Sequence, residues 1–241
     1  MPPKVDAFRT LDVLKGRQTM PEGSFLDHLP GDTWPLLVRA WGSDARVYER
    51  DEELPLGPDD RHVYIVLGGC VLQERFPLGT KITRFRGVGQ LLGEAKLIEP
   101  AASVRTVCLT TTWVMPCPVQ RMNVLLHQQP DAQLALLRSL EDRNRSDERI
   151  YGTVTRPPLQ RVGSLLLHLA DVAGTSSASQ PGHTTILGPT QRDIADALSM
   201  GMSTVENAIR SLRDTHRAIT SKYRQFVVTD PSALHDIVMP A

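Results

Sequence analysis

The sequence predicts an α+β protein: an N-terminal β-roll (a jelly-roll arrangement of strands), a long helix that joins two subunits, and a C-terminal winged helix-turn-helix. Three observations lead to this prediction. Short apolar stretches separated by turn residues fill residues 24–118. The apolar period then becomes helical over residues 119–157. Residues 158–241 combine a helix, an interrupted helix and a basic hairpin, in that order.

Composition limits the class of protein. Hydrophobic residues make up 41% of the 241 residues, which is typical of a folded chain and excludes a disordered one. The formal net charge is zero, so any affinity for nucleic acid must come from a local patch. Apolar runs fall short of the roughly 20 residues that cross a bilayer. The first residues, MPPKVDAFRT, lack the apolar core of a secretory signal. We therefore expect a cytoplasmic protein without a membrane partner.

Residues 1–23 mix charge, Pro and Gly without a sustained period, and we expect a loose leader there. The domain over 24–118 holds three clear β stretches, HVYIVLGGCVLQ (62–73), KITRFRGVGQLLG (81–93) and VRTVCLTTTWVM (104–115). Turn residues such as those at 57–60 and 77–79 separate them. This spacing is typical of a sandwich, roll or barrel. Its three cysteines, odd in number and widely spaced, argue against a disulfide framework or a compact metal site.

The segment 119–157 is expected to be helical and to contain the dimerisation helix. Leu134, Leu137 and Leu140, with Leu136 beside them, form an apolar stripe, and Ile150, Tyr151 and Val154 resume it after a polar stretch. Such a helix either bridges solvent or joins two subunits. We favour the subunit seam, because apolar residues occur at both ends. Pro157 and Pro158 are expected to end the helix.

The segment 158–241 is expected to be a small second domain. A buried helix over 159–170 precedes a Gly/Ser-rich stretch, GTSSASQPGHTT, which we expect to be a loop. The interrupted helix is TQRDIADALSMGMSTVENAIRSLR (190–213), and RAITSKYRQFVVT (217–229) is expected to be a hairpin with a basic tip.

The interrupted helix has the pattern of a helix-turn-helix. Thr190 and Asp193 form a capping box, and Gly201 is expected to supply the unusual backbone angle of the break. Val205, Ile209 and Leu212 restart the apolar stripe. A second helix with this pattern presents its polar face to a major groove. The residues left on that face are Met202, Ser203, Glu206, Asn207, Arg210 and Arg213.

The alternative for this segment is a surface helical hairpin with solvated charges. Residues 190–224 hold six basic and four acidic residues, a net charge of +2, which modestly favours DNA. The candidate DNA contacts are Thr190, Gln191, Met202, Ser203, Thr204, Asn207, Arg210 and, in the hairpin, Lys222.

In this layout the chain resembles the Crp/Fnr family of bacterial transcription regulators. The residues 190–213 carry the resemblance together with QLLGEAKLIEPAASVRTVCLT (90–110), which is similar to the family's nucleotide phosphate-binding cassette in a cyclic-nucleotide-binding-like roll. The resemblance implies a homodimer that binds double-stranded DNA and regulates transcription without being an enzyme. It also implies RNA polymerase as a further partner and a small-molecule effector in the roll.

The cassette departs from the family pattern. Gly93 and Glu94 match the pair that holds the ribose, but Ala102 and Ser103 stand where the family has the Arg-Ser pair for the cyclic phosphate. Arg105 lies on the same strand face, displaced by about 6–7 Å. On the long helix, Ser146 and Asp147 stand where the family's adenine contacts lie. The candidate effector residues are therefore Gly93, Glu94, Ser103, Arg105 and Ser146. A cyclic nucleotide stays a candidate cofactor, although the missing guanidinium argues against an ordinary cyclic-AMP response.

The second helix of the helix-turn-helix departs as well. Met202, Ser203 and Asn207 replace the Arg, Glu and Arg with which the family reads G and C bases. Asn suits the N6 and N7 edge of adenine, and Met offers only apolar contact. We therefore expect an operator that lacks the family's usual half-site.

Three other functions remain open from the sequence. The chain could regulate DNA without an effector, or it could be a nucleotide-sensing module that regulates a partner protein. A cupin-type metalloenzyme would need converging His and Glu ligands, and His62, His127 and His168 lack that spacing.

Cys70, Cys108 and Cys117 lie in apolar surroundings, which favours buried structural thiols over redox sensors.

Overall fold

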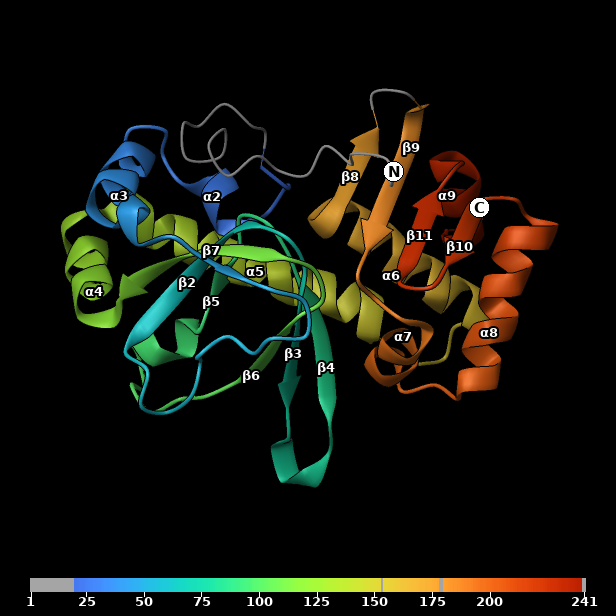
Figure 1. Ribbon diagram of the computed structural model, residues 1–241, viewed down its shortest axis with the longest axis horizontal. Helices are drawn as coiled ribbons and strands as arrows, with labels where there is room; N and C mark the ends of the chain where they lie inside the picture. The colour runs from blue at the N-terminus through green and yellow to red at the C-terminus, as the bar shows by residue number, and fades with distance from the viewer. Residues whose placement is uncertain (1–19, 153, 178–179, 240–241) are drawn as a thin grey trace.

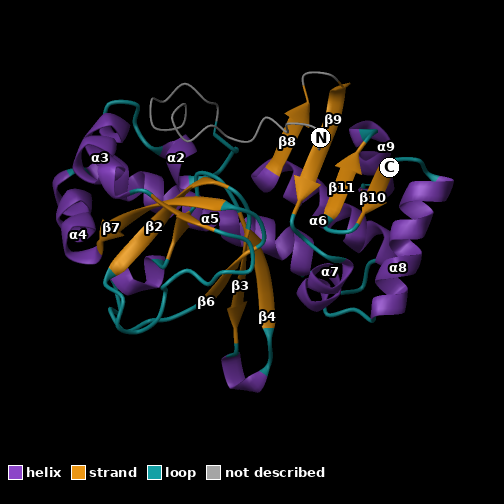
Figure 2. Ribbon diagram, viewed as in Figure 1, coloured by secondary structure: helices purple, strands orange, loops and turns teal. Residues whose placement is uncertain are grey.

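The structure, a computed structural model, describes residues 20–152, 154–177 and 180–239. Figures 1 and 2 show two lobes side by side, with one long helix running behind the first lobe and toward the second. The first lobe contains the strands β1 to β7, and the second contains α6 to α9 with the strands β8 to β11. Of the leader expected over residues 1–23, residues 1–19 lie outside the described residues.

The first lobe is a roll of two antiparallel sheets. One sheet has the order β1 (Arg46–Tyr48), β7 (Thr112–Pro118), β2 (His62–Gly68) and β5 (Leu91–Leu92). The other has the order β4 (Ile82–Arg86), β3 (Val71–Arg75) and β6 (Arg105–Cys108). The short 3₁₀ turns η1 (Gly42–Asp44), η2 (Pro77–Gly79) and η3 (Glu94–Leu97) lie in the connections. The predicted roll is confirmed.

The predicted β texture does not extend back to residue 24. The lobe begins with two helices, α2 (Phe25–His28) and α3 (Thr33–Trp41), and the first strand starts at Arg46. Ser24 caps α2, since its hydroxyl accepts a hydrogen bond from the Asp27 N–H. Phe25 and Trp41 then bury their rings beneath the roll. The Ser24 cap and the buried apolar residues of the two helices favour helix here, although both helices are as short as strands.

Both faces of β2 are buried, which explains why its sequence is continuously apolar. Val63, Ile65 and Leu67 pack toward the helices, whereas Tyr64 and Val66 pack between the two sheets. Helices α4 (Val119–Gln128) and α5 (Pro130–Tyr151) cover the outer face of this sheet. The roll therefore lies between its partner sheet on one side and a helical layer on the other.

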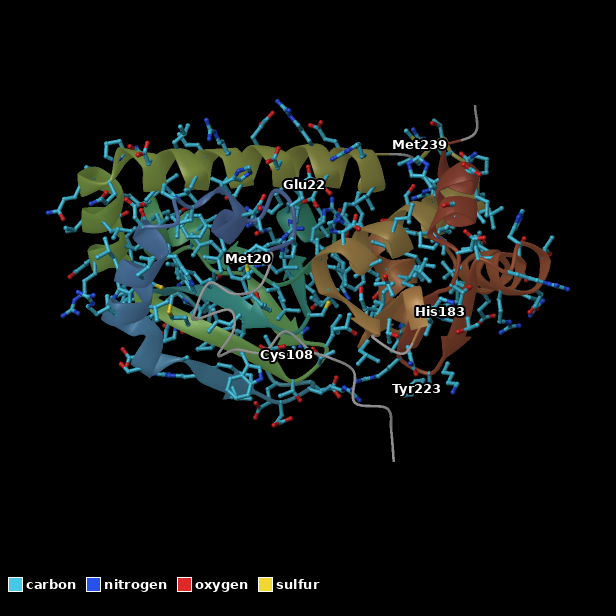
Figure 3. All side chains as sticks on the ribbon, turned by 90° about the horizontal axis from the view of Figure 1, so that it is seen from above. Met20, Glu22, Cys108, His183, Tyr223 and Met239 are labelled. Carbon is cyan, nitrogen blue, oxygen red and sulfur yellow. The ribbon has the colours of Figure 1, made fainter. Side chains whose placement is uncertain are left out.

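The apolar stripe of α5 divides into two parts. Leu136 and Leu140 pack against the roll, but Leu134 and Leu137 are 43% and 57% exposed. Figure 3, viewed from above, shows α5 along the edge of the molecule with an open outer side. Of the predicted stripe, these two exposed leucines remain available for a second subunit.

Two expectations about the end of the long helix are wrong. The helix ends at Tyr151, with Gly152 as its cap, so Val154 lies beyond it, and Pro157–Pro158 instead begin α6 (Pro158–Ala173). Proline is well placed there, because the first turn of a helix needs no N–H donor. Ile150 and Tyr151 pack within their own chain, so they are not part of a subunit seam.

The second lobe contains a four-stranded antiparallel sheet of order β10 (Ile219–Lys222), β11 (Gln225–Val228), β9 (Gln180–Leu187) and β8 (Gly174–Ser177). The Gly/Ser-rich stretch is therefore a hairpin and not a loop. Its β-branched residues Thr184, Thr185 and Ile186 pair with β11, a partner that local sequence does not reveal. The remaining elements are α7 (Gln191–Leu198), α8 (Met202–Arg210), a π-helical turn η4 (Ser211–Thr215) and α9 (Pro231–Val238).

The two lobes share one apolar cluster. Leu72, Phe85 and Leu109 of the roll belong to the same cluster as Leu166 of α6 and Ile194 of α7. At the contact Gly87 touches α6 so closely that a Cβ there would lie 1.9 Å from the Val172 carbonyl oxygen. The Val88 N–H donates to that same oxygen at 3.1 Å. Among the described residues, no helix is long and apolar enough to cross a membrane.

Candidate DNA interface and effector cassette

Helix α7 begins with the predicted capping box. The Asp193 N–H donates to the Thr190 hydroxyl at 3.1 Å, and the Thr190 N–H donates to the Asp193 carboxylate at 2.7 Å. Two of the free N–H groups at the helix start are satisfied in this way. Ile194, Ala195 and Leu198 are buried as expected. The box fixes where α7 begins, and therefore where the turn to α8 lies.

The break between the helices uses a different residue from the one expected. Ser199, and not Gly201, has the left-handed conformation, with φ 50° and ψ 51°. Gly201 has φ −65° and is the N-cap of α8. The N–H of Met200 donates to the Ala195 carbonyl at 2.9 Å, and the buried Arg161 guanidinium of α6 donates to the Leu198 carbonyl. The carbonyls at the end of α7 are thus bound from within the domain.

Helix α8 buries one face and exposes the other. Val205, Ile209 and Leu212 are at most 1% exposed. The polar set predicted from the sequence lies on the opposite, exposed face: Met202, Ser203, Glu206, Asn207, Arg210 and Arg213. Thr204, another predicted DNA contact, is half-buried. Figure 1 shows α8 at the outer edge of the molecule, with no described part of its own chain over that side.

The predicted hairpin follows α8 and forms a wing. Strands β10 and β11 pair from Ile219–Val228 to Lys222–Gln225, and the turn exposes Lys222 and Tyr223. Arg224, the next residue, turns back to the roll, where its Nη1 lies 3.0 Å from Asp51. Thr190 and Gln191, at the start of α7, are half-buried. The structure brings the wing, α7 and α8 into one lobe.

The cassette in the roll forms an open hollow of about 840 Å³, lined by Gly93, Ala102, Ser103 and Arg105 among others. Gly93 has φ 77°, which favours glycine, and it leads into η3 at Glu94. The Arg105 guanidinium binds two carboxylates, Glu74 at 2.5 Å and Glu53 at 2.5 Å. A cation held by two carboxylates has little charge left for a phosphate.

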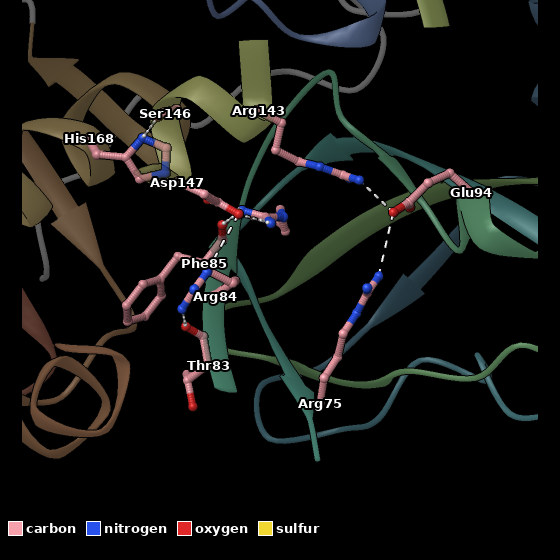
Figure 4. A network of polar contacts seen from close by, with 10 residues as sticks. Arg75, Thr83, Arg84, Phe85, Glu94, Arg143, Ser146, Asp147 and His168 are labelled. Atoms are coloured by element: carbon pink, nitrogen blue, oxygen red, sulfur yellow. Dashed lines mark hydrogen bonds and ion pairs between the residues drawn. The ribbon is translucent and has the colours of Figure 1, made fainter. Parts of the chain in front are cut away.

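Glu94 is also occupied. Its carboxylate lies 2.5 Å from Arg143 of α5 and 3.6 Å from Arg75 of β3, as the dashed lines in Figure 4 show. Burial is the largest single effect and acts to raise the pKa of Glu94, but Arg143, a backbone hydrogen bond and Arg75 together outweigh it, and the net shift is downward. The carboxylate is therefore ionised and paired where the family's pattern would have it hold a ribose.

The two α5 positions next to the cassette make contacts of their own. Asp147 accepts two hydrogen bonds from Arg86, at 3.1 and 2.8 Å. Close by in the chain, the Arg84 guanidinium stacks 3.8 Å from the centre of the Tyr151 ring. The Ser146 hydroxyl lies 3.3 Å from Nδ1 of His168 in α6. Figure 4 shows Ser146 beside His168, and Asp147 pointing toward the strand that carries Arg84. The positions that would face a base thus connect the two lobes.

Comparison with known proteins agrees with this geometry. The Crp-like helix-turn-helix domain family matches residues 160–237. The nitrogen fixation regulation protein FixK of Azorhizobium caulinodans is 27% identical over 210 residues, which cover 82% of this chain and 80% of FixK. The chain is a transcriptional regulator of the Crp/Fnr type.

Two solved structures share the fold of this Crp/Fnr regulator. FixK2 of Bradyrhizobium japonicum aligns with a TM-score of 0.64 at 22% identity, over 82% of this chain and 98% of its own. The CRP-family regulator TTHB099 of Thermus thermophilus gives 0.64 at 22% identity, over 80% of this chain and 96% of its own. The long helix and both lobes therefore have counterparts in solved regulators.

The sequence did not predict several residues of this regulator's cassette. Arg143, Arg86 and Glu74 hold the predicted effector residues or their neighbours, but they come from segments 31 to 61 residues away in the chain. One signal was present: an aspartate at 147, on a helix beside a roll rich in arginine, needs a cationic partner. All three thiols are buried and free, as predicted for Cys70, Cys108 and Cys117. Burial raises the pKa of the Cys70 thiol to about 12 and so holds it in the unreactive form.

The ligand set of a metalloenzyme is missing from the part of the chain that the structure describes. No group of three or more His, Cys, Asp or Glu residues that could hold a metal ion occurs there. His62 is bound to Asp60 at 2.9 Å, and Nδ1 of His127 lies 2.7 Å from the Asn123 carbonyl oxygen.

Proposed function

We propose that this regulator is a homodimer that reads double-stranded DNA with α8 and needs no cyclic nucleotide to do so. The observation that carries the proposal is the free polar face of α8, which begins at the helix-turn-helix break. Short side chains at its first turn, Ser203 and Thr204, allow close approach to base edges. Because DNA is the partner, we place the protein in the cytoplasm.

Within this proposal Asn207 and Arg210 read bases and Lys222 of the wing binds phosphate. Asn207 is exposed near the middle of α8, and its amide suits adenine. Arg210 lies one turn farther along, where it reaches guanine or the backbone. Lys222 supplies a charge that fixes the position of the domain without reading sequence. Thr190 and Gln191 add contacts from the N-terminus of α7, where free N–H groups favour a phosphate.

The exposed leucines of α5 support the homodimer. Leu134 and Leu137 lie one turn apart on the outer side of the helix, and Val124 of α4 is 55% exposed nearby in sequence. Large aliphatic side chains at three- and four-residue spacing favour a helix from a second copy. Two copies are also what a DNA site with two half-sites requires.

The ion pairs of the cassette support independence from cyclic nucleotide. A cyclic phosphate in the hollow would have to displace Glu74 or Glu53 from Arg105, and the buried Glu74 would then face the phosphate. A ribose would have to displace Arg143 from Glu94. The pair between Arg143 and Glu94 is buried on both sides, and removing one partner of a buried ion pair strongly destabilises a fold, so we expect this pair to persist. The alternative, a nucleotide-sensing module that regulates a partner protein, requires such a ligand.

Selection of bound sequences from random DNA tests the proposal. We expect two inverted half-sites about one helical turn apart, without the G/C-rich half-site usual in the family. Asn207→Ala should relax preference at one adenine, lowering discrimination by about 1–3 kcal/mol. Gln120→Ala, an exposed amide on α4, is the matched control and should leave the selected sequence unchanged. Failure to enrich any sequence would refute the proposal in favour of the partner-protein module. An unchanged preference in Asn207→Ala would refute base reading by Asn207.

A further inference from the structure

A single lysine connects the roll to the first helix of the helix-turn-helix. Lys81 immediately precedes β4, and its ammonium lies 2.6 Å from Glu74 of β3 and 3.0 Å from Asp196 of α7. Glu74 belongs to the roll and Asp196 to the DNA-binding lobe. The ammonium therefore bridges two carboxylates that come from different lobes.

Glu74 is the carboxylate that depends most on this cation. Glu74 is buried, and a buried carboxylate stays ionised only next to positive charge. Burial acts to raise the pKa of Glu74, but its hydrogen bonds to Lys81 and Arg105 outweigh burial and lower it. The bond to Glu74 is the largest cause that raises the pKa of Lys81. Glu74 thus has two cations, Lys81 and Arg105, and Lys81 also contacts Asp196.

The bridge lies beside an apolar contact between the lobes. Leu72 and Phe85 of the same two strands share an apolar cluster with Ile194 and Leu198 of α7. On the wing side, Arg224 binds Asp51 at 3.0 Å. Two ion pairs, one to α7 and one to the wing, therefore accompany a continuous apolar interface. Charged pairs of this kind fix register and orientation more than they add affinity.

We infer that Lys81 is a positioning residue: it holds α7 against the roll and thereby fixes the orientation of α8 relative to α5. Helices α7 and α8 share one apolar cluster, so α8 follows when α7 moves. In a dimer built on α5, this orientation sets the distance between the two copies of α8. Two half-sites bind together only when that distance matches the DNA, about 34 Å. The inference rests on the proposed function and adds the residue that tunes the spacing.

Charge reversal tests the inference. In the full chain, Lys81→Glu places three carboxylates together. We therefore expect α7, with the DNA-binding lobe, to move away from the roll. We expect the ratio between affinity for the two-half-site operator and affinity for a single half-site to fall about fivefold. Lys81→Met should change the ratio in the same direction by a smaller factor. The exchange Lys81→Glu with Asp196→Lys re-forms the pair between the lobes at unchanged net charge, but it places a carboxylate beside Glu74. It should therefore restore part of the ratio, to within about twofold of the native value.

Arg39→Glu is the matched control, since it reverses an exposed cation on α3 far from the bridge and should leave the ratio unchanged. A second readout is hydrogen exchange at the Val88 amide, which donates across the lobe contact. It should speed up in Lys81→Glu and recover in the exchange variant. A ratio in Lys81→Glu equal to that of Arg39→Glu, or no recovery in the exchange variant, overturns the inference. If the native chain binds no operator, the proposed function fails, while exchange at Val88 still tests the bridge.

Discussion

Glu94 and Asp147 keep the positions of ligand-binding residues but bind arginines of their own chain. The sequence identified Glu94 as a cassette residue and placed Asp147 where the family contacts adenine. It did not identify Arg143 or Arg86, because 49 and 61 residues separate the partners. A position in a motif is visible in a sequence, whereas the group that occupies a side chain depends on tertiary contacts. The DNA contacts predicted on α8 stay predictions for the same reason.

His168 supplies a prediction at this scale. Burial, with a smaller effect from Arg86, lowers the pKa of His168 from 6.5 to about 4. The unfolded chain therefore binds more protons than the folded chain between pH 4 and 6.5, so stability falls as pH decreases through this window. From about pH 7 to about pH 5 the native protein should lose about 2 kcal/mol more free energy of unfolding than His168→Gln. Urea unfolding at both pH values measures the difference.

The control for this prediction is His127→Gln. His127 is exposed on α4, so this variant should lose as much stability as the native protein between the two pH values. Equal losses in all three proteins would contradict the prediction, because they would mean that His168 is hydrated and that burial does not lower its pKa.

At the scale of single elements, helical period and capping predicted more than turn and loop composition did. The capping box at Thr190 and the stripe Val205, Ile209 and Leu212 are local patterns, and the structure confirms both. The β8–β9 hairpin and the end of α5 depend on distant partners. Thr185 of β9 pairs with Val227 of β11. Helix α5 ends at Tyr151, which packs into the contact between the lobes. Composition alone therefore predicted a loop where the β8–β9 hairpin lies, and a helix that continues beyond the end of α5.

The turn between α7 and α8 gives a prediction for one element. Ser199 has the left-handed backbone that costs an L-residue roughly 1–2 kcal/mol. Ser199→Gly should therefore raise the free energy of unfolding by about 1 kcal/mol, and Ser199→Val should lower it by at least as much. Gly201→Ala has open space for its Cβ, with Thr204 Oγ1 3.7 Å away, and should cost no more than about 1 kcal/mol. Chemical denaturation of the three variants measures these changes.

If Ser199→Gly destabilises the protein and Gly201→Ala does so severely, the break depends on Gly201 as the sequence suggested. The expected result instead leaves the orientation of α8 to Ser199 and to the Arg161 contact with Leu198.

At the scale of the whole molecule, the sequence predicted the order of the parts but not how they pack. Strand β3 shows why: Val71 faces the inside of the roll, and the next residue, Leu72, faces the DNA-binding lobe. Both are apolar, and alternation alone cannot say that the second surface is another domain. The roll, the long helix and the helix-turn-helix each follow from local period. Their junction at Gly87, Lys81 and Asp51 follows only from coordinates.

The charged side chains of the cassette, Arg105 and Glu94, are paired with other residues of the regulator itself, so we expect DNA binding not to depend on a cyclic nucleotide. Fluorescence anisotropy on the selected operator, with and without saturating cyclic AMP or cyclic GMP, tests this central claim directly. An allosteric effector changes affinity by about 5- to 150-fold, whereas we predict that affinity stays within about twofold with either nucleotide. A gain of about tenfold or more with either nucleotide would contradict the claim, because Arg105 and Glu94 would then have exchanged their partners for the ligand.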